Sequence, residues 1–312
     1  MKVAILDDYQ NVALQMADWT PVTQHAEITV FTDHVADPDG VVARLAPFDV
    51  VFVMRERTPL PRAIIERLPN LKMIASTGPY NASIDTEAAA EHGIYIGTTG
   101  GSVASTIELT WALILAGSRN LVGEVLSVRD GGWQVSVGRE LSGRTLGVLG
   151  LGRIGGAVAR IGAAFGMPVI AWSQNLSPAA AEEAGVGYVD RDTLFATSDV
   201  LSIHLRLSDR TRGLVGPAEL AAMKPTALLV NTSRGPIVDE PALIAVLRAR
   251  EIAGAALDTF DIEPLPGGHP LRELDNVIAT PHIGYVADRP YRIFFGDAVA
   301  AIADWLGQNA HG

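Results

Sequence analysis

Three polar segments in the second half of the chain each follow a short apolar run. They are VNTSRGPIVDE at 230–240, LDTFDIEPLP at 257–266 and ATPHIGY at 279–285. In an open parallel α/β sheet, ligands bind at the carboxyl ends of the strands. We therefore expect four polar residues to face one crevice: Arg234, Asp258, Glu263 and His282.

Three of these residue types suit proton transfer to a carbonyl oxygen. When a ketone accepts a hydride, the alkoxide that forms needs a proton, and histidine titrates near neutral pH. A carboxylate on the second ring nitrogen fixes the tautomer and favours the protonated ring, so Glu263 is the predicted partner of His282. The planar guanidinium of Arg234 can bind a carboxylate or carbonyl oxygen. Each residue alone also has a structural interpretation, but together, next to a glycine-rich loop, they favour catalysis.

That glycine-rich turn lies between a predicted strand and a predicted helix in LGVLGLGRIGGAVARIG, residues 146–162. In dinucleotide-binding folds the first glycine makes the turn, the second lets the backbone approach the pyrophosphate, and the third allows close packing of helix on strand. The helix N-terminus offers its N–H groups to the phosphates. The predicted contacts of a dinucleotide here are Gly150, Gly152, Arg153, Ile154 and Gly155.

The next strand ends in a loop without charge at the position that commonly selects the cofactor. About 20 residues past the glycine loop, NAD-specific proteins place Asp or Glu on the ribose, whereas Arg or Lys binds the 2′-phosphate of NADP. This chain has Ser173 and Gln174 there, so the loop either discriminates weakly by charge or is simply solvated. We expect NAD(H) or NADP(H) as the cofactor.

Short apolar strands alternate with helical patterns in two series, which predicts an α/β protein with two parallel sheets. The first series is VAIL at 3–6, ITVF at 28–31, DVVFVM at 49–54 and LKMIAS at 71–76, and the second runs from TLGVLG at 145–150 to NVIATPH at 276–282. Long helices are expected at 102–121 and near 287–306. We predict two Rossmann-like or flavodoxin-like domains. They are a discontinuous substrate domain, 1–98 plus 283–312, and a dinucleotide-binding domain, 99–282.

The composition excludes several classes of function. The 312 residues carry a net charge of −11, which argues against nucleic acids and anionic membranes as partners. No apolar run approaches the roughly 18 residues of a membrane span, and the first residues do not resemble a secretory signal, so we expect a cytoplasmic protein.

Asp239 before Pro241 is predicted to cap a helix. No metal site is predicted, because no ligand spacing links His25, His34, His92, His269 and His311.

The sequence closely resembles the D-isomer-specific 2-hydroxyacid dehydrogenase family over nearly its whole length. The resemblance is carried by GLGRIG at 150–155, MKPTALLVNTSRGPIVDEPAL at 223–243, LDTFDIEPLP at 257–266 and TPHIG at 280–284. It implies reversible hydride transfer between a nicotinamide cofactor, with a slight preference for NAD, and a 2-oxo acid that becomes the D-2-hydroxy acid. The substrate would be like glyoxylate or hydroxypyruvate, or larger. It also implies a homodimer built mainly from the cofactor domains.

The resemblance implies roles for individual residues as well. His282 would be the general acid/base, Glu263 its partner and Arg234 the substrate anchor. Asp258 would hold the nicotinamide amide, Thr232 and Gly284 would line the cofactor, and His204 would lie on the adenine side. The expected substrate-binding residues are Arg57, Thr77, Gly78, Tyr80 and Tyr285.

Several positions depart from the family pattern. Family members commonly read Gly-Val-Gly where this chain has TGPYN at 77–81, and main-chain N–H groups there hold the substrate carboxylate. Pro79 has no N–H and Tyr80 is bulky, so the carboxylate clamp is expected to be altered. Arg55 and Arg57 either supply replacement charge or are solvated. Formate is an unlikely substrate, because the formate dehydrogenases of this family carry Gln where Glu263 stands.

Two alternatives stay open at this point. A dinucleotide-sensing protein, like the NADH-binding corepressors that resemble this family, would bind cofactor without significant turnover. The second alternative is a dehydrogenase whose substrate is not a simple 2-oxo acid. It is suggested by Tyr285, which stands where the family commonly has a small residue, and by the changes at Pro79 and Tyr80.

Overall fold

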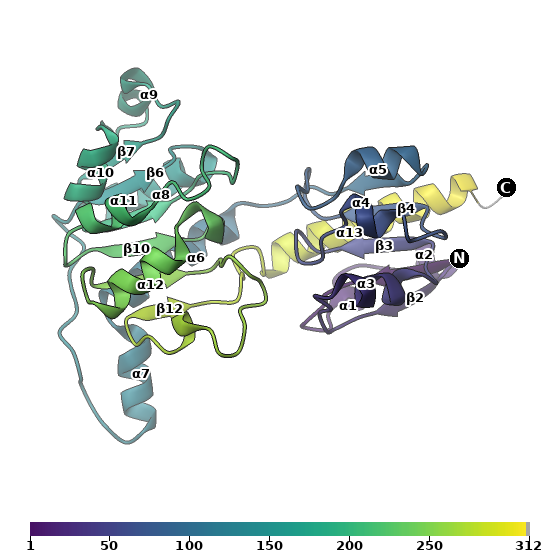
Figure 1. Ribbon diagram of the computed structural model, residues 1–312, viewed down its shortest axis with the longest axis horizontal. Helices are drawn as coiled ribbons and strands as arrows, with labels where there is room; N and C mark the ends of the chain where they lie inside the picture. Colours follow the sequence, from purple (N-terminus) through teal and green to yellow (C-terminus); the bar gives the residue numbers. More distant parts are fainter. Residues whose placement is uncertain (310–312) are drawn as a thin grey trace. The chain divides into compact units, whose positions relative to one another are not determined.

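Two parallel sheets form in the computed structural model, which describes residues 1–309 (Figure 1). The chain divides into two units: unit 1 is Met1–Ser102 with the chain from Val286 onward, and unit 2 is Val103–Tyr285. Hydrogen bonds near residues 102 and 285 tie the adjoining segments to their own unit. Gly100 N donates to Asp297 Oδ2 at 2.8 Å and keeps the preceding segment in unit 1, whereas Gly284 N donates to Asp258 Oδ2 at 2.8 Å and keeps its own segment in unit 2.

Unit 1 contains a five-stranded sheet in the order β2-β1-β3-β4-β5, and every pair of strands is parallel. Its strands are β1 (Lys2–Ile5), β2 (Glu27–Val30), β3 (Val50–Val53), β4 (Met73–Ser76) and β5 (Tyr95–Thr98). The central β3 and β4 are buried along their whole length, as their apolar sequences predict. β5 was not expected, because Gly97 and the exposed Tyr95 and Thr98 obscure its pattern.

Helices flank this sheet. They are α1 (Ala13–Met16), α2 (Thr20–Thr23), α3 (Pro38–Leu45), α4 (Arg62–Ile65), α5 (Thr86–Glu91) and the final α13 (Asp288–Asn309). Helix α13 contacts α1, α2, β4 and β5, so the end of the chain returns to the first sheet. Phe295 of α13 stacks on Phe52 of β3 with ring centroids 5.2 Å apart.

Unit 2 contains a seven-stranded parallel sheet in the order β12-β11-β10-β9-β6-β7-β8. Its strands are β6 (Leu146–Leu149), β7 (Val169–Trp172), β8 (Gly187–Tyr188), β9 (Val200–Ile203), β10 (Leu228–Asn231), β11 (Gly254–Leu257) and β12 (Val277–Ala279). The strand order reverses at β6, which lies between β7 and β9. Such a switch point is where doubly wound sheets bind ligands. The predicted α/β fold is therefore confirmed.

The helices of unit 2 are α6 (Ala104–Ser118), α7 (Leu121–Arg129), α8 (Arg153–Ala164), α9 (Pro178–Glu183), α10 (Arg191–Thr197), α11 (Pro217–Ala222) and α12 (Glu240–Arg248). Asp239 is the N-cap of α12 and accepts from Ala242 N at 2.9 Å, as predicted. The expected helix at 102–121 is α6. Helix α7 buries none of its residues, which explains why its sequence has no clear apolar period.

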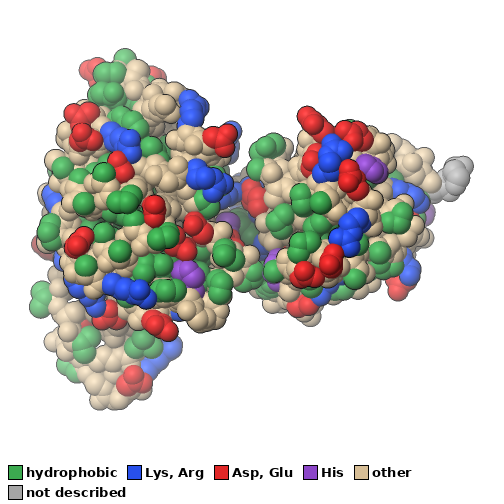
Figure 2. All heavy atoms as spheres, in the orientation of Figure 1, with side chains coloured by type: hydrophobic (Ala, Val, Ile, Leu, Met, Phe, Trp, Pro, Cys, Tyr) green, Lys and Arg blue, Asp and Glu red, His purple; other side chains and the backbone are tan. Residues whose placement is uncertain are grey.

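The surface carries side chains of both charges (Figure 2). On the face drawn in Figure 2, acidic and basic side chains are interspersed, and the blue side chains do not merge into a continuous patch. No helix within residues 1–309 is long and apolar enough to cross a membrane.

Candidate active site

His282 and Glu263 are in direct contact. His282 Nδ1 lies 2.5 Å from Glu263 Oε2, and the side chains are 19% and 32% exposed. His282 follows β12 and Glu263 follows β11, its neighbour in the sheet, so the parallel order brings together residues 19 positions apart. The glutamate therefore occupies Nδ1 of the ring and leaves Nε2 as its second nitrogen.

The backbone of His282 adopts a left-handed conformation with φ of 53°. This region costs a non-glycine residue roughly 1–2 kcal/mol, although histidine tolerates it better than most residues. Asp258 accepts from Thr280 Oγ1 at 2.6 Å and from the N–H groups of Ile283 and Gly284 at 2.8 Å each, and so holds the segment on both sides of His282. The carboxylate of Asp258 thus anchors the backbone around His282, which the sequence did not reveal.

Burial and hydrogen bonding act on the pKa of Asp258 in opposite directions. The residue is 1% exposed, and burial raises the pKa of its carboxyl, while the three donors act in the opposite direction. One oxygen accepts two hydrogen bonds and the other accepts one, which leaves acceptor capacity on Oδ2 for one further donor such as an amide.

Arg234 follows β10, so the three expected catalytic residues follow three adjacent strands. Its carbonyl oxygen accepts from Asn231 Nδ2 at 2.9 Å, and its Nη1 donates to Ser233 O at 2.8 Å. The next residue, Gly235, packs on the backbone of the Glu263 loop, where a Cβ would lie 2.1 Å from Phe260 C. Glycine is needed here because the Arg234 turn and the Glu263 loop touch.

The glycine turn has the geometry of a phosphate cradle. Gly150 has φ of 102°, and a Cβ on Gly155 would lie 2.0 Å from Gly150 O, so both positions require glycine. Gly152 is the N-cap of α8, and a Cβ there would meet no atom within 4 Å. Arg153 and Ile154 form the first turn of that helix. A dinucleotide pyrophosphate fits this open helix N-terminus.

The other expected cofactor residues have protein partners. His204 Nε2 is 2.8 Å from Ser202 Oγ, and burial of the ring lowers the pKa of His204 to about 4. The hydroxyls of Thr232 and Thr110 are 2.8 Å apart, and Gly284 O accepts from Thr106 Oγ1 at 3.1 Å, so α6 supports this edge of the sheet. Ser173 O accepts from Leu176 N at 3.0 Å, and Gln174 is exposed.

The expected substrate residues of unit 1 follow β3 and β4. Arg57 Nη1 donates to Asp7 O at 2.6 Å, and its guanidinium lies 4.6 Å from the ring centroid of Tyr9. Thr77 is buried and accepts from Arg55 through both its hydroxyl and its carbonyl oxygen. Gly78 N donates to Thr99 Oγ1 at 2.8 Å. These groups of Thr77 and Gly78 hold the loop itself.

Two tyrosines among the expected substrate residues differ in their surroundings. Tyr80 is 70% exposed, whereas Tyr285 is 8% exposed. The ring of Tyr285 meets the imidazole of His282 edge-on, with centroids 5.4 Å apart. Tyr285 therefore packs against the imidazole of His282.

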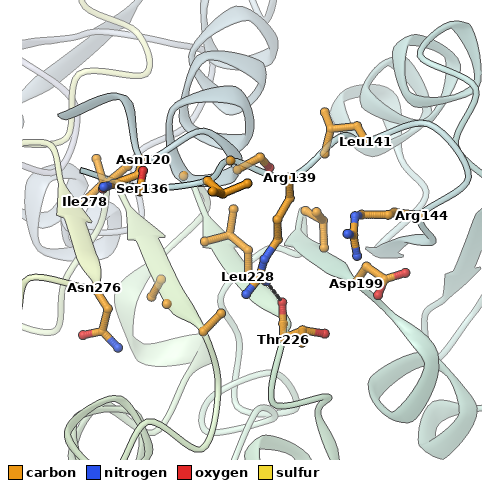
Figure 3. A pocket seen from close by; sticks show the side chains of 18 of the residues that line it. Asn120, Ser136, Arg139, Leu141, Arg144, Asp199, Thr226, Leu228, Asn276 and Ile278 are labelled. Atoms are coloured by element: carbon orange, nitrogen blue, oxygen red, sulfur yellow. Dashed lines mark hydrogen bonds between the residues drawn. The ribbon is translucent and has the colours of Figure 1, made fainter. Parts of the chain in front are cut away.

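A cavity of about 340 Å³ lies at the opposite, amino edge of the unit 2 sheet (Figure 3). Its wall combines the irregular segment 136–144 with residues that precede β9 to β12, and Arg139 Nη1 reaches across it to Thr226 O. Its lining includes none of the three catalytic candidates. Within residues 1–309, no group of three or more His, Asp or Glu side chains is arranged to hold a metal ion.

Known proteins resemble this chain in sequence and in structure. The family model for the D-isomer specific 2-hydroxyacid dehydrogenase, NAD binding domain, matches residues 111–284. A glyoxylate reductase of Thermococcus litoralis is 40% identical over 268 residues, which cover 83% of this chain and 81% of that protein. A hydroxypyruvate reductase of Thermotoga maritima is 39% identical over 264 residues, with 83% and 84% covered.

A crystal structure of phosphoglycerate oxidoreductase from Vibrio cholerae O395 superposes with a TM-score of 0.94 at 42% identity and covers 99% of both chains. The family model spans most of unit 2, and the relatives extend across both units. The chain belongs to the D-isomer-specific 2-hydroxyacid dehydrogenase family.

Proposed function

We propose that the chain reduces a 2-oxo acid to its D-2-hydroxy acid, and catalyses the reverse oxidation, with His282 as general acid/base. The observation that carries this proposal is the 2.5 Å contact between His282 Nδ1 and Glu263. It fixes the proton on Nδ1 and turns Nε2 toward the reaction. The glyoxylate and hydroxypyruvate reductases among the relatives support the substrate class.

The chemistry divides among few groups. A nicotinamide, when bound, supplies or accepts the hydride. During reduction His282 Nε2 donates a proton to the carbonyl oxygen, and during oxidation it removes the hydroxyl proton. The Glu263 carboxylate stabilises the imidazolium, and the Arg234 guanidinium binds the substrate carboxylate or carbonyl oxygen.

We assign the dinucleotide to unit 2 as the cofactor domain. The pyrophosphate would lie on Gly150, Gly152, Arg153, Ile154 and Gly155. His204, Thr232, Asp258 and Gly284 would lie along the rest of the cofactor. Ser173 and Gln174 are uncharged and discriminate weakly between NAD and NADP, and we favour NAD. Substrate binding is assigned to Arg57, Thr77, Gly78 and Tyr80 of unit 1, the substrate domain, and to Tyr285.

We also propose a homodimer formed through unit 2. Helix α7 and the segment after it expose apolar side chains, among them Leu126 at 51%, Trp133 at 73% and Val137 at 97%. Such a run of exposed apolar residues is characteristic of an interface. Sedimentation of the wild type and of Leu126→Glu checks this assignment, with a dimer expected for the first and a monomer for the second.

The first test measures initial rates of NADH and of NADPH oxidation with glyoxylate, hydroxypyruvate, pyruvate, phenylpyruvate and 2-oxoisocaproate. We expect turnover on at least one of them, faster with NADH. His282→Ala and His282→Asn should reduce turnover roughly 10³-fold and leave dinucleotide affinity unchanged. Asparagine is included because it tolerates the left-handed backbone.

Unchanged turnover in both variants would refute the role of His282. No turnover on any of these acids, with both dinucleotides bound, would favour a substrate of another class or an NADH-sensing protein.

A further inference from the structure

The loop between β11 and β12 carries Glu263 on an exposed stretch of chain. Ile262 is 65% exposed, and a Cβ on Gly267 or Gly268 would meet nothing within 4 Å. Such a loop holds one conformation only where specific contacts fix it, and the contact between Glu263 and His282 requires that it does. What fixes this loop is therefore a question about the acid/base site.

One carboxylate of α12 holds the loop on both sides of Glu263. Glu240 Oε2 accepts from Asp261 N at 3.3 Å, two residues before Glu263. Glu240 Oε1 lies 3.0 Å from His269 Nε2, six residues after Glu263. Both side chains are 16% exposed, so the pair is largely shielded from water.

The tautomer of His269 follows from its second contact. His269 Nδ1 accepts from Leu271 N at 3.3 Å, where it caps the short 3-10 helix η2 (Pro270–Arg272). An accepting Nδ1 places the proton on Nε2, so His269 donates to Glu240. The two donors, His269 Nε2–H and Asp261 N–H, occupy both oxygens of Glu240.

Glu240 is not needed to start its own helix. Asp239 is the N-cap of α12 and accepts from Ala242 N at 2.9 Å. The carboxylate of Glu240 is turned to the neighbouring loop instead. Desolvation, together with the nearby Glu240 carboxylate, raises the pKa of the Asp261 carboxyl, which places Glu240 close to this loop.

We propose that Glu240 and His269 form a positioning pair that holds Glu263 against His282. This proposal rests on the proposed function of His282 and Glu263. Neither residue of the pair touches the reacting atoms. Their contribution is to keep Glu263 Oε2 within hydrogen-bond distance of His282 Nδ1.

Three variants separate positioning from simple structural support. Glu240→Gln keeps one side-chain oxygen that can accept, whereas Asp261 N and His269 Nε2 each need an acceptor oxygen. His269→Asn keeps an oxygen that can cap Leu271 N but cannot reach Glu240, whereas His269→Ala loses both contacts. Asp275→Asn, which breaks the exposed ion pair with Arg250 in the same unit, is the matched control.

The first readout is the low-field proton NMR signal of His282 Nδ1–H, which needs no turnover. It is assigned by its loss in His282→Asn. We expect this signal to move upfield or broaden in Glu240→Gln and in His269→Asn and to stay in Asp275→Asn. A signal unchanged in both positioning variants would overturn the proposal.

The second readout is kcat as a function of pH. We expect Glu240→Gln and His269→Asn to lower kcat roughly fivefold with dinucleotide affinity unchanged, and the double variant to be no worse than either single one. Adding Glu240→Gln to Glu263→Gln should have no further effect. Variants that lose thermal stability but keep the wild-type pH profile would show a merely structural role.

The two readouts also separate this proposal from the proposed function. An NMR signal that responds to Glu240→Gln in a protein without turnover on 2-oxo acids would support the positioning pair and refute the proposed substrate class. His269→Ala should lower the melting temperature more than His269→Asn, because it also removes the cap of η2.

Discussion

Among the histidine–carboxylate pairs of the described residues, one in unit 1 and the one at His282 in unit 2 have different settings. In unit 1, His34 Nδ1 is 2.9 Å from Asp7 Oδ1, and in unit 2, His282 Nδ1 is 2.5 Å from Glu263 Oε2. Each pair lies beyond the carboxyl ends of parallel strands. Each contains a residue with left-handed backbone, since φ is 56° at Asp7 and 53° at His282.

The Asp7 carboxylate is a buried junction. Its second oxygen accepts from Thr58 Oγ1 at 2.6 Å, and its main-chain carbonyl accepts from Arg57 Nη1 at 2.6 Å. Asp7, His34 and Thr58 follow β1, β2 and β3, which are neighbours in the sheet. The Asp7 side chain is 2% exposed, and its contacts with His34 and Thr58 cross-link three loops.

The strained residue differs between the pairs. In unit 1 it is Asp7, whose carboxylate oxygens accept from protein donors, and in unit 2 it is His282, whose Nδ1 contacts Glu263. A histidine–carboxylate pair therefore stabilises loops when the carboxylate is buried and shared. We expect proton transfer where the carboxylate is partly exposed and holds a ring that stays accessible, as at Glu263, whose second oxygen accepts from Phe260 N at 2.9 Å.

Asp7→Ala should have the largest effect on stability. It leaves Thr58 and His34 without their acceptor and places alanine in the left-handed region, which together cost about 4 kcal/mol. Asp7→Asn tolerates this backbone and retains one acceptor, so we expect about half of that loss. Urea unfolding measures both variants. A free energy of unfolding within 1 kcal/mol of the wild type for Asp7→Ala would show that the junction does not cross-link unit 1.

His204 extends the comparison of the two histidine–carboxylate pairs, because the partner of its ring is the hydroxyl of Ser202 and not a carboxylate. Burial lowers its pKa to about 4 from an ordinary value of 6.5. A depressed pKa means that the neutral ring stabilises the fold above pH 6.5, and that this contribution is lost as the pH falls toward 4. The difference corresponds to about 3 kcal/mol.

Chemical unfolding between pH 7 and pH 4 measures this loss. His204→Gln has no ring to protonate, so its stability should fall less on acidification than that of the wild type. Equal losses in the two proteins would assign the acid sensitivity to other groups.

Much of the candidate site could be predicted from the sequence, because strand order in a parallel sheet is a strong constraint. Polar residues that follow successive strands must meet at one edge, which placed Arg234, Glu263 and His282 after β10, β11 and β12. The glycine turn and the cap at Asp239 could be predicted for a different reason. Each is a local sequence pattern that has one physical solution.

The supporting contacts could not be predicted, because they join residues far apart in the sequence. Asp258 resembles a cofactor ligand in its motif, yet its oxygens hold a segment more than 20 residues away. His34 is 27 residues from Asp7, and nothing in either local sequence points to the other. Helix α7 and strand β5 were missed because little or none of their surface is buried, so no apolar pattern marks them.

Glu263→Gln tests the other half of the comparison. Glutamine can accept from His282 Nδ1–H but cannot stabilise the imidazolium by charge, so we expect kcat/KM to fall roughly 100-fold, or about 2.7 kcal/mol. Because the Glu263 side chain is 32% exposed, its loss of charge should change the free energy of unfolding by less than about 1 kcal/mol. His34→Gln is the matched control in unit 1, with turnover within about twofold of the wild type and a clear loss of stability. The reverse result, in which His34→Gln loses activity and Glu263→Gln loses stability, would exchange the roles that the two settings assign to these pairs.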